Sequence, residues 1–439
     1  MGGFLIIRYF RTSSFTRSVG GEGELLFAQT ESRCGLHPVI FLYIYRPPHI
    51  KSSEGAIYLK RVCALLTALL LLCTLLIPVS AYDELSTDAK ACIVIDAKTG
   101  RVLGGHNIHE RLPMASTTKI MTALLALEHG DLDQWFPVDS DAIHVEGSSM
   151  GLQDGDQVTL RALLYGMMLP SGNDAANATA VHIGGDMDSF VAKMNWKASE
   201  LGLKDTQFRN PSGLDAEGHF SSAYDMAQLC REAMKHDIFQ EICCLSKAQV
   251  EFGNPPYRRW LENYNKLLTM YPYCIGVKTG FTEAAYRCLV SAAEKDGMTL
   301  ICVTLNCPDD WSVHEFLYER YFSNLNQQDL SSEIPRTLPM TNSALNREGT
   351  EVSEIAVRPA LNLMLPLQSS DSVSVQLFRK PMIFAPVSEG AVLGEIQITI
   401  NGENVLTTEL LAAENLSSIN QEKEPSLIDR LRDFALQLF

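Results

Sequence analysis

A serine and a lysine stand three residues apart at the start of one predicted helix. The stretch from Pro113 to Gly130 contains Ser116 and Lys119, begins after a proline break and ends at a glycine suited to a helix C-terminus. Residues at this spacing share one helix face, so the lysine amine lies beside the serine hydroxyl. A lysine with a lowered pKa can take the serine proton and make the hydroxyl a nucleophile. The pair predicts covalent catalysis by Ser116 with Lys119 as its base.

Two further short motifs follow in order along the chain. Ser171-Gly172-Asn173 lies in a loop between predicted helices, and Lys278-Thr279-Gly280 follows an apolar strand segment that could line a cleft. Each tripeptide is a weak signal by itself, because Lys98-Thr99-Gly100 and Ser418-Ile419-Asn420 repeat the same patterns elsewhere. Order and predicted context therefore select Ser171-Gly172-Asn173 and Lys278-Thr279-Gly280 as the motifs that would join Ser116 at one site.

Segments with strand character flank a long helical region, and together they predict the fold. A hairpin is expected at 91–103, and strand character resumes in three later segments: 274–277, 286–293 and 298–305. Helical patterns fill the chain to about residue 250, and residues 315–322 predict a closing helix. We expect an α+β fold over residues 82–325, with one antiparallel sheet built from both ends of the domain, an inserted helical lobe, and a cleft between them.

The chain changes character twice after this domain. Residues 326–350 are polar and irregular, which predicts a linker, and alternating residues beyond them predict a small all-β domain over 351–418. Residues 419–439 predict an amphipathic helix, because apolar residues recur at helical spacing: Leu427, Leu431, Phe434 and Leu438. That helix could lie on a membrane surface, or it could pack on the β domain or on a partner.

An apolar run near the N-terminus has the three regions of a secretory signal. Lys60 and Arg61 precede the run from Val62 to Val79, and small residues up to Ala81 provide a cleavage site. We predict a signal peptide at 59–81 and an exported protein at the extracytoplasmic face of the cell membrane or in the cell wall. An uncleaved membrane helix is the alternative.

Residues 1–58 precede this signal and show no periodic pattern. Secretory signals normally begin a chain, so we expect the natural start to lie near Leu59 and the preceding residues not to belong to the protein. The alternative is a disordered leader.

Composition excludes some classes of function. The 439 residues are 46% hydrophobic and 20% charged, as in globular proteins of two or three domains, and the net charge of −16 argues against binding to nucleic acid. Eight of the eleven cysteines follow the predicted cleavage site without C-x-x-C spacing, so we expect no obligatory disulfide framework. His106 and His109 have no third ligand in view, and we expect no metal and no cofactor.

The three motifs in this order resemble the signature of the D-alanyl-D-alanine carboxypeptidases. These low-molecular-mass penicillin-binding proteins are serine peptidases of the β-lactamase/transpeptidase-like superfamily. The resemblance covers about residues 85–325 and extends to the flanks of the motifs: Pro113-Met114-Ala115, Asn173-Asp174-Ala175-Ala176, Asn210-Pro211-Ser212-Gly213-Leu214-Asp215 and Gly276-Val277-Lys278-Thr279-Gly280-Phe281-Thr282. It implies the β-lactamase/transpeptidase-like fold followed by a β domain and a terminal helix.

The resemblance also implies the roles of the catalytic residues. Ser116 would attack the peptide bond between the two terminal D-alanines of a peptidoglycan stem peptide and form an acyl-enzyme. Lys119 would be its base, Ser171 would relay a proton to the leaving amine, and Asn173 would hold the substrate's amide. Water would then release the shortened peptide, and β-lactam antibiotics would bind the same serine covalently as inhibitors.

A carboxylate-binding strand is implied in the same way. Lys278 and Thr279 would receive the terminal carboxylate of the substrate. Gly280 would let the backbone lie close to the substrate. The backbone N–H groups of Ser116 and Phe281 would form the oxyanion hole.

Two positions depart from the family pattern. Many relatives have an arginine near the position of Asp309-Asp310-Trp311, which is acidic here, so we expect carboxylate recognition to depend more on Lys278 and Thr279. Relatives more often have Ala-Gly-Tyr where this chain has Ala284-Ala285-Tyr286, and we expect Ala285 to crowd a turn slightly.

Other interpretations of the same residues stay open. A β-lactamase would need a deacylating base, for which Glu217 is the one candidate in the loop after Gly213, although its Gly-Leu-Asp context favours a carboxypeptidase. A non-catalytic β-lactam sensor or wall-binding protein would be acylated and stay acylated. Endopeptidase action on cross-links is a further variant. Asp174 and Asp215 could be catalytic acids, but we interpret both as residues that fix loops.

Overall fold

The structure is a computed structural model, and it describes residues 15–20, 23–28, 40–45 and 82–419. The chain forms two compact units, Met1–Val79 and Ser80–Phe439. The predicted signal peptide at 59–81 and the predicted amphipathic helix at 419–439 lie outside the described residues, except for residue 419. No helix in the described part of the chain is both long and apolar enough to cross a membrane.

The first unit contains a small antiparallel sheet. Its three strands pair in chain order: β1 (Phe15–Gly20), β2 (Gly23–Ala28) and β3 (Ile40–Tyr45). We expected residues 1–58 either not to belong to the protein or to form a disordered leader. The three strands differ from the expectation of a disordered leader. Aromatic and β-branched residues in these segments favour extended backbone even where the pattern is too short to show a period. The predicted start near Leu59 stays a prediction.

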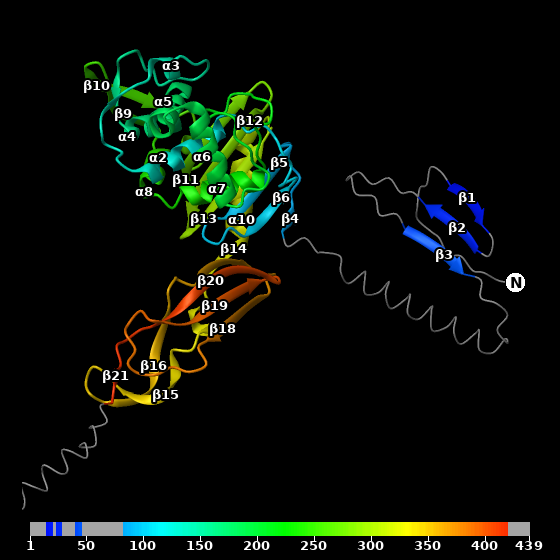
Figure 1. The fold of residues 1–439 in the computed structure, drawn as a ribbon, viewed down its shortest axis with the longest axis vertical. Coiled ribbons are helices and arrows are strands. Elements are labelled where there is room, and N and C mark those ends of the chain that lie inside the picture. Colours follow the sequence, from blue (N-terminus) through cyan, green and yellow to red (C-terminus); the bar gives the residue numbers. More distant parts are fainter. Residues whose placement is uncertain (1–14, 21–22, 29–39, 46–81, 420–439) are drawn as a thin grey trace, which may run out of the picture. The chain divides into compact units, whose positions relative to one another are not determined.

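A six-stranded sheet forms the centre of the domain over residues 82–324, called the catalytic domain below after the sequence prediction (Figure 1). Its spatial order is β11 (Cys274–Thr282), β12 (Tyr286–Lys295), β13 (Met298–Leu305), β5 (Ala91–Asp96), β6 (Val102–His106) and β4 (Asp83–Glu84). All neighbours are antiparallel except β4 and β6. The pairing of β13 with β5 joins the two ends of the domain, as predicted from the sequence.

Both faces of this sheet are covered, which explains why β5 is buried along its whole length. Successive residues of a strand point to opposite faces. Ile93 and Ile95 pack in the large core shared with the helical lobe, whereas Cys92 and Val94 pack in a second core under α10 (Asp310–Asn324). The cysteines of this region are small buried residues, and no disulfide forms among the eight cysteines of residues 82–419.

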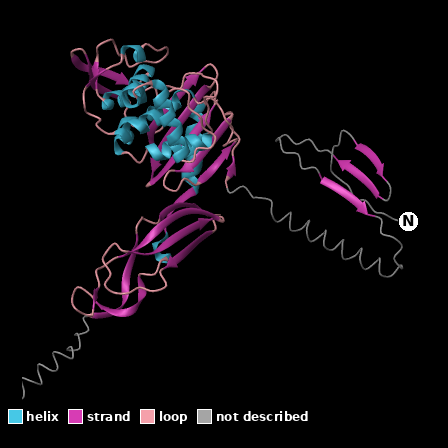
Figure 2. Ribbon diagram, in the orientation of Figure 1, coloured by secondary structure: helices cyan, strands magenta, loops and turns pink. Residues whose placement is uncertain are grey.

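The helical lobe, whose helices are cyan in Figure 2, lies between β6 and β11 in the sequence. Its central helix is α2 (Lys119–His129), which follows the 3-10 turn η1 (Ala115–Thr118) and packs against α4, α5, α6 and α7. The lobe's helices are α3 (Ser140–Ile143), α4 (Leu160–Met168), α5 (Asn173–Gly184), α6 (Met187–Glu200), α7 (Ala223–Ala233), α8 (Asp237–Cys243) and α9 (Leu267–Met270). Thr159 and Ser222 cap α4 and α7, since each side chain accepts a hydrogen bond from a backbone N–H of the first turn.

The lobe also contains a four-stranded sheet that the sequence pattern did not predict. Its order is β10 (Pro256–Glu262), β9 (Lys247–Gly253), β8 (Gln157–Val158) and β7 (Phe136–Pro137). Two of these strands have only two residues, which is too short to show a period of two.

A separate all-β domain follows α10 directly. Its strands are β14 (Leu325–Asp329), β15 (Thr337–Leu345), β16 (Glu351–Pro359), β17 (Met364–Gln368), β18 (Val373–Arg379), β19 (Val392–Ile400), β20 (Glu403–Ala412) and β21 (Ser417–Ser418), with a 3-10 turn η2 (Leu330–Glu333). They form the ribbon β14-β17 and a sheet ordered β18-β19-β20-β16-β15-β21.

The prediction of a linker at 326–350 was wrong. That segment holds most of β14, all of η2 and all of β15, and four of its apolar side chains are buried in the β-domain core: Leu330, Ile334, Leu338 and Ala344. Strands with one solvated face carry so many polar residues that the segment read as irregular.

Two side chains of the β5-β6 hairpin bind the β domain. The Arg101 guanidinium forms a two-pronged ion pair with Asp371, with one N–H to O distance of 2.7 Å, and both side chains are buried. The Lys98 ammonium donates to the backbone carbonyls of Asn362 and Met364 at 2.7 and 2.9 Å. The second Lys-Thr-Gly tripeptide is therefore part of a contact between domains.

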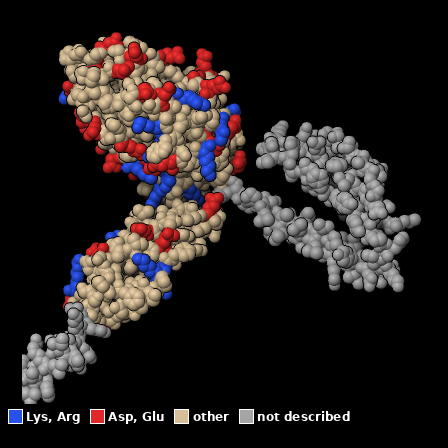
Figure 3. All heavy atoms as spheres, viewed as in Figure 1, with Lys and Arg blue, Asp and Glu red and all other residues tan. Residues whose placement is uncertain are grey.

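Acidic and basic side chains are interspersed on the face of the catalytic domain seen in Figure 3.

Candidate active site

Ser116 and Lys119 meet at the junction of η1 and α2. The Lys119 Nζ lies 2.9 Å from the Ser116 Oγ, 2.7 Å from the Asn173 Oδ1 and 2.6 Å from the Ser212 carbonyl oxygen. The side chain is completely buried. Burial, and secondarily the positive charge of Lys278, hold the pKa of Lys119 well below its ordinary value, although Asp174 opposes them.

A neutral amine at this position has a defined orientation. It carries two N–H donors and one lone pair, whereas the charged form carries three donors. Asn173 Oδ1 and Ser212 O can only accept, so they take both N–H groups. In the neutral form the lone pair would face Ser116, and the Ser116 O–H would donate to it. A neutral Lys119 would then be in position to accept the Ser116 proton.

Two glycines allow other segments to approach the backbone of the turn Ala115–Thr118, which contains Ser116 and is called the nucleophile turn below. A Cβ on Gly213 would lie 1.9 Å from the Ala115 carbonyl oxygen, and a Cβ on Gly280 would lie 3.2 Å from the Ser116 nitrogen. Ala115 itself has a φ of 48°, in the left-handed region that is unfavourable for alanine. The turn is therefore held in a strained conformation by backbone packed against it from both sides.

The second motif lies at the start of α5. Ser171 is buried with a φ of 62°, and it lines the same hollow as Ser116. The Asn173 side chain accepts from Lys119, and its Nδ2 donates to the Glu146 carbonyl at 2.7 Å. Asn173 therefore positions the Lys119 amine in this structure, and its contact with the substrate's amide stays a prediction.

Asp174 and Asp215 both fix loops. The Asp174 carboxylate accepts from the Ser149 hydroxyl at 2.6 Å and from the backbone N–H groups of residues 150–152 at 2.9 to 3.0 Å. Asp215 accepts from the Thr282 hydroxyl at 2.7 Å, at the end of β11. The sequence interpretation of these residues agrees with their contacts.

The third motif lies on β11, at the edge of the main sheet. Lys278 is buried, and its Nζ donates to the Thr279 carbonyl at 2.8 Å. Burial lowers the pKa of Lys278 to about 7, although the neighbouring Cys243 thiol acts in the opposite direction. Thr279, Gly280 and Phe281 line a hollow of about 310 Å³ together with Ser116 and Ser171. The three motifs thus meet at one cleft.

Arg287 is a site residue that the sequence analysis missed. It lies on β12 opposite Phe281, lines the hollow, pairs with the buried carboxylate of Asp310, and places its guanidinium 5.1 Å from the centre of the Trp311 ring. The acidic segment 309–310 therefore holds an arginine in the cleft instead of leaving the cleft without one. The place of this arginine in the cleft depends on the pairing of β12 with the strand of the third motif, which no local sequence pattern records.

The strained position near this arginine also differs from the expectation. We expected Ala285 to crowd the turn, but Ala285 is buried and its N–H donates to the Thr282 hydroxyl at 3.0 Å. The positive φ falls on Tyr286, at 54°. Ala285, which stands where the family pattern has glycine, is not in the left-handed region, and the residue after it is.

The two candidate metal ligands belong to different networks. His106 contacts the Ala89 carbonyl at 2.7 Å, and His109 pairs with Asp205 at 3.5 Å. Within the described residues no group of three potential ligands is suited to a metal ion.

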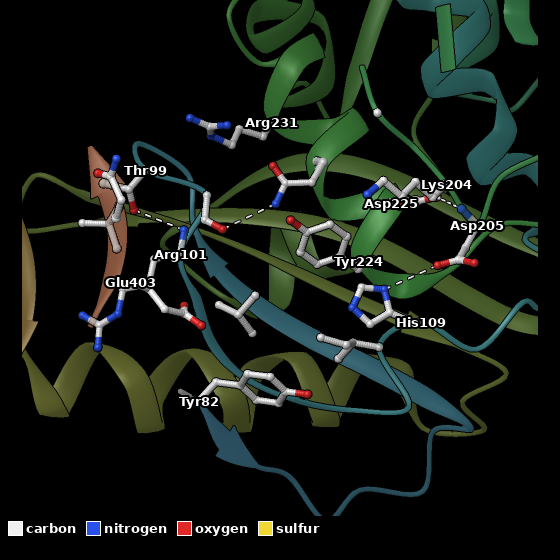
Figure 4. A pocket seen from close by; sticks show the side chains of 17 residues that line it. Tyr82, Thr99, Arg101, His109, Lys204, Asp205, Tyr224, Asp225, Arg231 and Glu403 are labelled. Carbon is white, nitrogen blue, oxygen red and sulfur yellow. Dashed lines mark hydrogen bonds and ion pairs between the residues drawn. The ribbon is translucent and has the colours of Figure 1, made fainter. Parts of the chain in front are cut away.

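A larger hollow, of about 630 Å³, lies away from the three motifs (Figure 4). It is lined by the β5-β6 hairpin, α7 and the tip of the β19-β20 hairpin, and Figure 4 shows His109 directed toward Asp205 beside Tyr224. It contains no motif residue, so size alone does not identify the site of chemistry here.

Comparison with known proteins agrees with this geometry. Residues 79–309 match the family model of peptidase S11, D-alanyl-D-alanine carboxypeptidase. The chain is 33% identical over 352 residues to D-alanyl-D-alanine carboxypeptidase DacF of Bacillus subtilis, covering 76% of this chain and 87% of that protein. It is 31% identical over 378 residues to DacC of Escherichia coli, covering 81% and 89%.

The fold matches a solved structure as well. The crystal structure of D-alanyl-D-alanine carboxypeptidase DacD from Francisella tularensis aligns with a TM-score of 0.54 and 25% identity, covering 76% of this chain and 95% of that one. The buried lysine beside the serine, the three motifs at one cleft and these matches agree, and the chain belongs to the D-alanyl-D-alanine carboxypeptidase family of serine-type peptidases.

Proposed function

We propose that this protein removes the terminal D-alanine from peptidoglycan stem pentapeptides through an acyl-enzyme on Ser116. The observation that carries the proposal is the buried amine of Lys119, 2.9 Å from the Ser116 Oγ, with its two other hydrogen-bonding positions occupied by acceptors. A neutral amine in this position can remove the proton of the attacking hydroxyl.

The proposed acylation step uses these groups in turn. The Ser116 Oγ attacks the carbonyl carbon of the penultimate D-alanine while its proton passes to the Lys119 Nζ. The resulting oxyanion accepts hydrogen bonds from the backbone N–H groups of Ser116 and Phe281, each worth about 3 kcal/mol of barrier. The C–N bond then breaks, and the leaving amine takes a proton from Lys119 through the Ser171 hydroxyl. Water hydrolyses the ester and restores the free Ser116.

Recognition of the terminal carboxylate is the role that we propose for the opposite wall of the cleft. Thr279 and Arg287 line the cleft and would supply a hydroxyl and a guanidinium, the latter paired with Asp310. The buried Lys278, next to Thr279, would supply an ammonium. A free C-terminal carboxylate is what distinguishes a carboxypeptidase substrate from an internal peptide bond, so these cations favour removal of the last residue.

β-Lactam antibiotics would acylate the same serine, because their strained amide and carboxylate match the peptide bond and carboxylate of the substrate. The apolar run before Tyr82 supports the proposal of export to the extracytoplasmic face, where the substrate is found. Contact of the C-terminal segment with the membrane surface is proposed on the helical spacing of its apolar residues alone.

Two alternatives from other classes are less favoured by the site. A β-lactamase would use Glu217 as its deacylating base, but this side chain is exposed in the loop, whereas the same loop presents the Ser212 carbonyl to Lys119. A sensor that stays acylated would need the same acylation chemistry without the release of product.

The test measures released D-alanine from diacetyl-lysyl-D-alanyl-D-alanine for the wild type and for Ser116→Ala, with penicillin labelling in parallel. We expect release that is lost in the variant, and a penicillin adduct on Ser116. Labelling without release would support the sensor, and rapid turnover of penicillin would support the β-lactamase. Absence of both activities would refute the assignment of this site.

A further inference from the structure

His219 begins a chain of hydrogen bonds that ends one residue before the nucleophile. Its Nδ1 accepts from the Arg209 backbone N–H at 2.9 Å, so the ring proton resides on Nε2. The Nε2–H donates to the Thr118 Oγ1 at 2.9 Å. The Thr118 hydroxyl in turn donates to the Ala115 carbonyl at 2.8 Å.

The Ala115 carbonyl and the Ser116 N–H belong to one peptide unit. A trans peptide is planar, so the direction of the carbonyl fixes the direction of the N–H on its other side. That N–H is the proposed oxyanion donor at Ser116. Ala115 has a positive φ, and without external contacts the peptide would relax toward a more favourable orientation.

The surroundings suit a permanently neutral imidazole. His219 is 6% exposed, and its ring lies edge-on to Phe208 with 6.1 Å between ring centres. Burial lowers the pKa of His219 to about 4, although the carboxylate of Asp215 opposes this. One tautomer therefore persists at the pH at which the protein would act.

We propose that His219 is a positioning residue for the oxyanion hole: through Thr118 it holds the Ala115–Ser116 peptide so that the Ser116 N–H points into the cleft. The inference rests on the proposed function, in which Ser116 is the acylated nucleophile. His219 does not touch the substrate and acts through two hydrogen bonds and one peptide plane.

The test measures acylation by a fluorescent penicillin in the full chain and separates the binding constant from the limiting rate. His219→Leu and Thr118→Val each interrupt the link, and we expect each to lower the limiting rate by about tenfold or more with little change in binding. His219→Gln keeps an N–H donor on a side chain of similar reach, and we expect it to recover most of the rate. The double variant His219→Leu with Thr118→Val should be no slower than either single variant, because one chain is broken twice.

Thr122→Val is the matched control. The Thr122 hydroxyl donates to the Pro211 carbonyl at 2.6 Å, so it also ties α2 to the same loop, but it does not reach Ala115. We expect this variant to keep a rate within about threefold of the wild type.

The outcomes separate the inference from the proposed function. A wild-type rate in His219→Leu, or an equal loss in Thr122→Val, would overturn the inference while leaving the acyl-enzyme intact. A wild type that neither binds penicillin nor releases D-alanine would refute both. If thermal unfolding shows that His219→Leu does not fold, the comparison of Thr118→Val with Thr118→Ser decides, and equal rates in those two would overturn the inference.

Discussion

Lys119 and Lys278 are both buried beside the cleft, and burial lowers the pKa of each amine. The Lys119 amine lies within hydrogen-bond distance of Ser116, Asn173 and Ser212, and burial holds its pKa well below the ordinary value. Lys278 has a pKa near neutrality, so it can still be charged when an anion enters. Lysine is usually exposed in folded proteins, so the sequence alone does not indicate that these two are buried. Their lowered pKa values follow from burial in the fold.

Lys278 gives a pH dependence with a defined sign. The pKa of about 7 lies below the ordinary value, so the charged form is lost as the pH rises through that range. We expect the KM of a peptide acid to increase between about pH 6 and about pH 9, because the carboxylate loses its cation. The KM of the matching peptide amide, which has no carboxylate, should stay level. Steady-state kinetics with both substrates measure this, and identical pH profiles would contradict it.

Arg287 should contribute to the binding of the same carboxylate. We expect Arg287→Gln to lower kcat/KM for the peptide acid by about 10- to 100-fold, the value of a charge-assisted hydrogen bond, and to leave an ester without a free carboxylate nearly unaffected. Arg258→Gln, at an exposed arginine of β10, is the control. Equal losses on both substrates would mean that Arg287 has only a structural role.

At the scale of elements, the loop 207–220 supports the nucleophile turn from outside. It supplies the Ser212 carbonyl to Lys119, the backbone of Gly213 to Ala115 and the His219 imidazole to Thr118. A loop with three backbone and side-chain contacts to one turn defines that turn's conformation more strictly than the helix propensity of α2 could.

Gly213→Ala tests this support. A Cβ would lie 1.9 Å from the Ala115 carbonyl oxygen, and the φ of 89° is unfavourable for alanine, so we expect loss of penicillin acylation and a lower melting temperature. Gly218→Ala is the matched control in the same loop, since it has a similar φ of 77° but its Cβ would meet only the flexible ends of Arg209 and Gln207. We expect it to cost about 1 kcal/mol and to keep acylation. Similar acylation in both variants would refute the role of the close contact.

The sequence predicted the elements that carry local signals. The main sheet, the helical lobe and the three motifs follow from periodicity and order, and the structure brings Ser116, Ser171 and Thr279 to one hollow. Arg287 escaped because its place depends on the register between β11 and β12, a pairing that no local pattern records. The strands within residues 326–350 were not predicted, because the residues on their solvated faces are polar and the segment resembles a linker.

At the scale of the whole molecule, the catalytic and β domains are joined by buried charge. Arg101 and Asp371 are exposed by only 8% and 2%, and the Asp371 carboxylate also accepts from the Gln368 N–H at 2.8 Å. Removing one partner of a buried pair leaves the other charge without compensation, which costs more than the pair itself contributes.

Arg101→Ala should therefore destabilise the protein by about 3 kcal/mol without changing acylation of Ser116, since neither partner lines the active cleft. The matched control is Arg161→Ala, which removes a two-pronged pair with Asp133 whose side chains are 36% and 71% exposed. We expect that loss to stay below about 1 kcal/mol. Denaturant unfolding followed by far-UV circular dichroism gives both values, and equal losses would contradict the importance of burial.

The pairing of β14 with β17 bears on how the chain can be cut. A protease requires a stretch that opens locally, and such stretches are usually the connections between domains. Here α10 ends at Asn324, β14 begins at Leu325, and the chain continues through η2 into β15. The segment that connects the two domains is thus a hydrogen-bonded strand, which a protease cleaves less readily than free backbone. We therefore expect limited proteolysis to leave the two domains on one fragment.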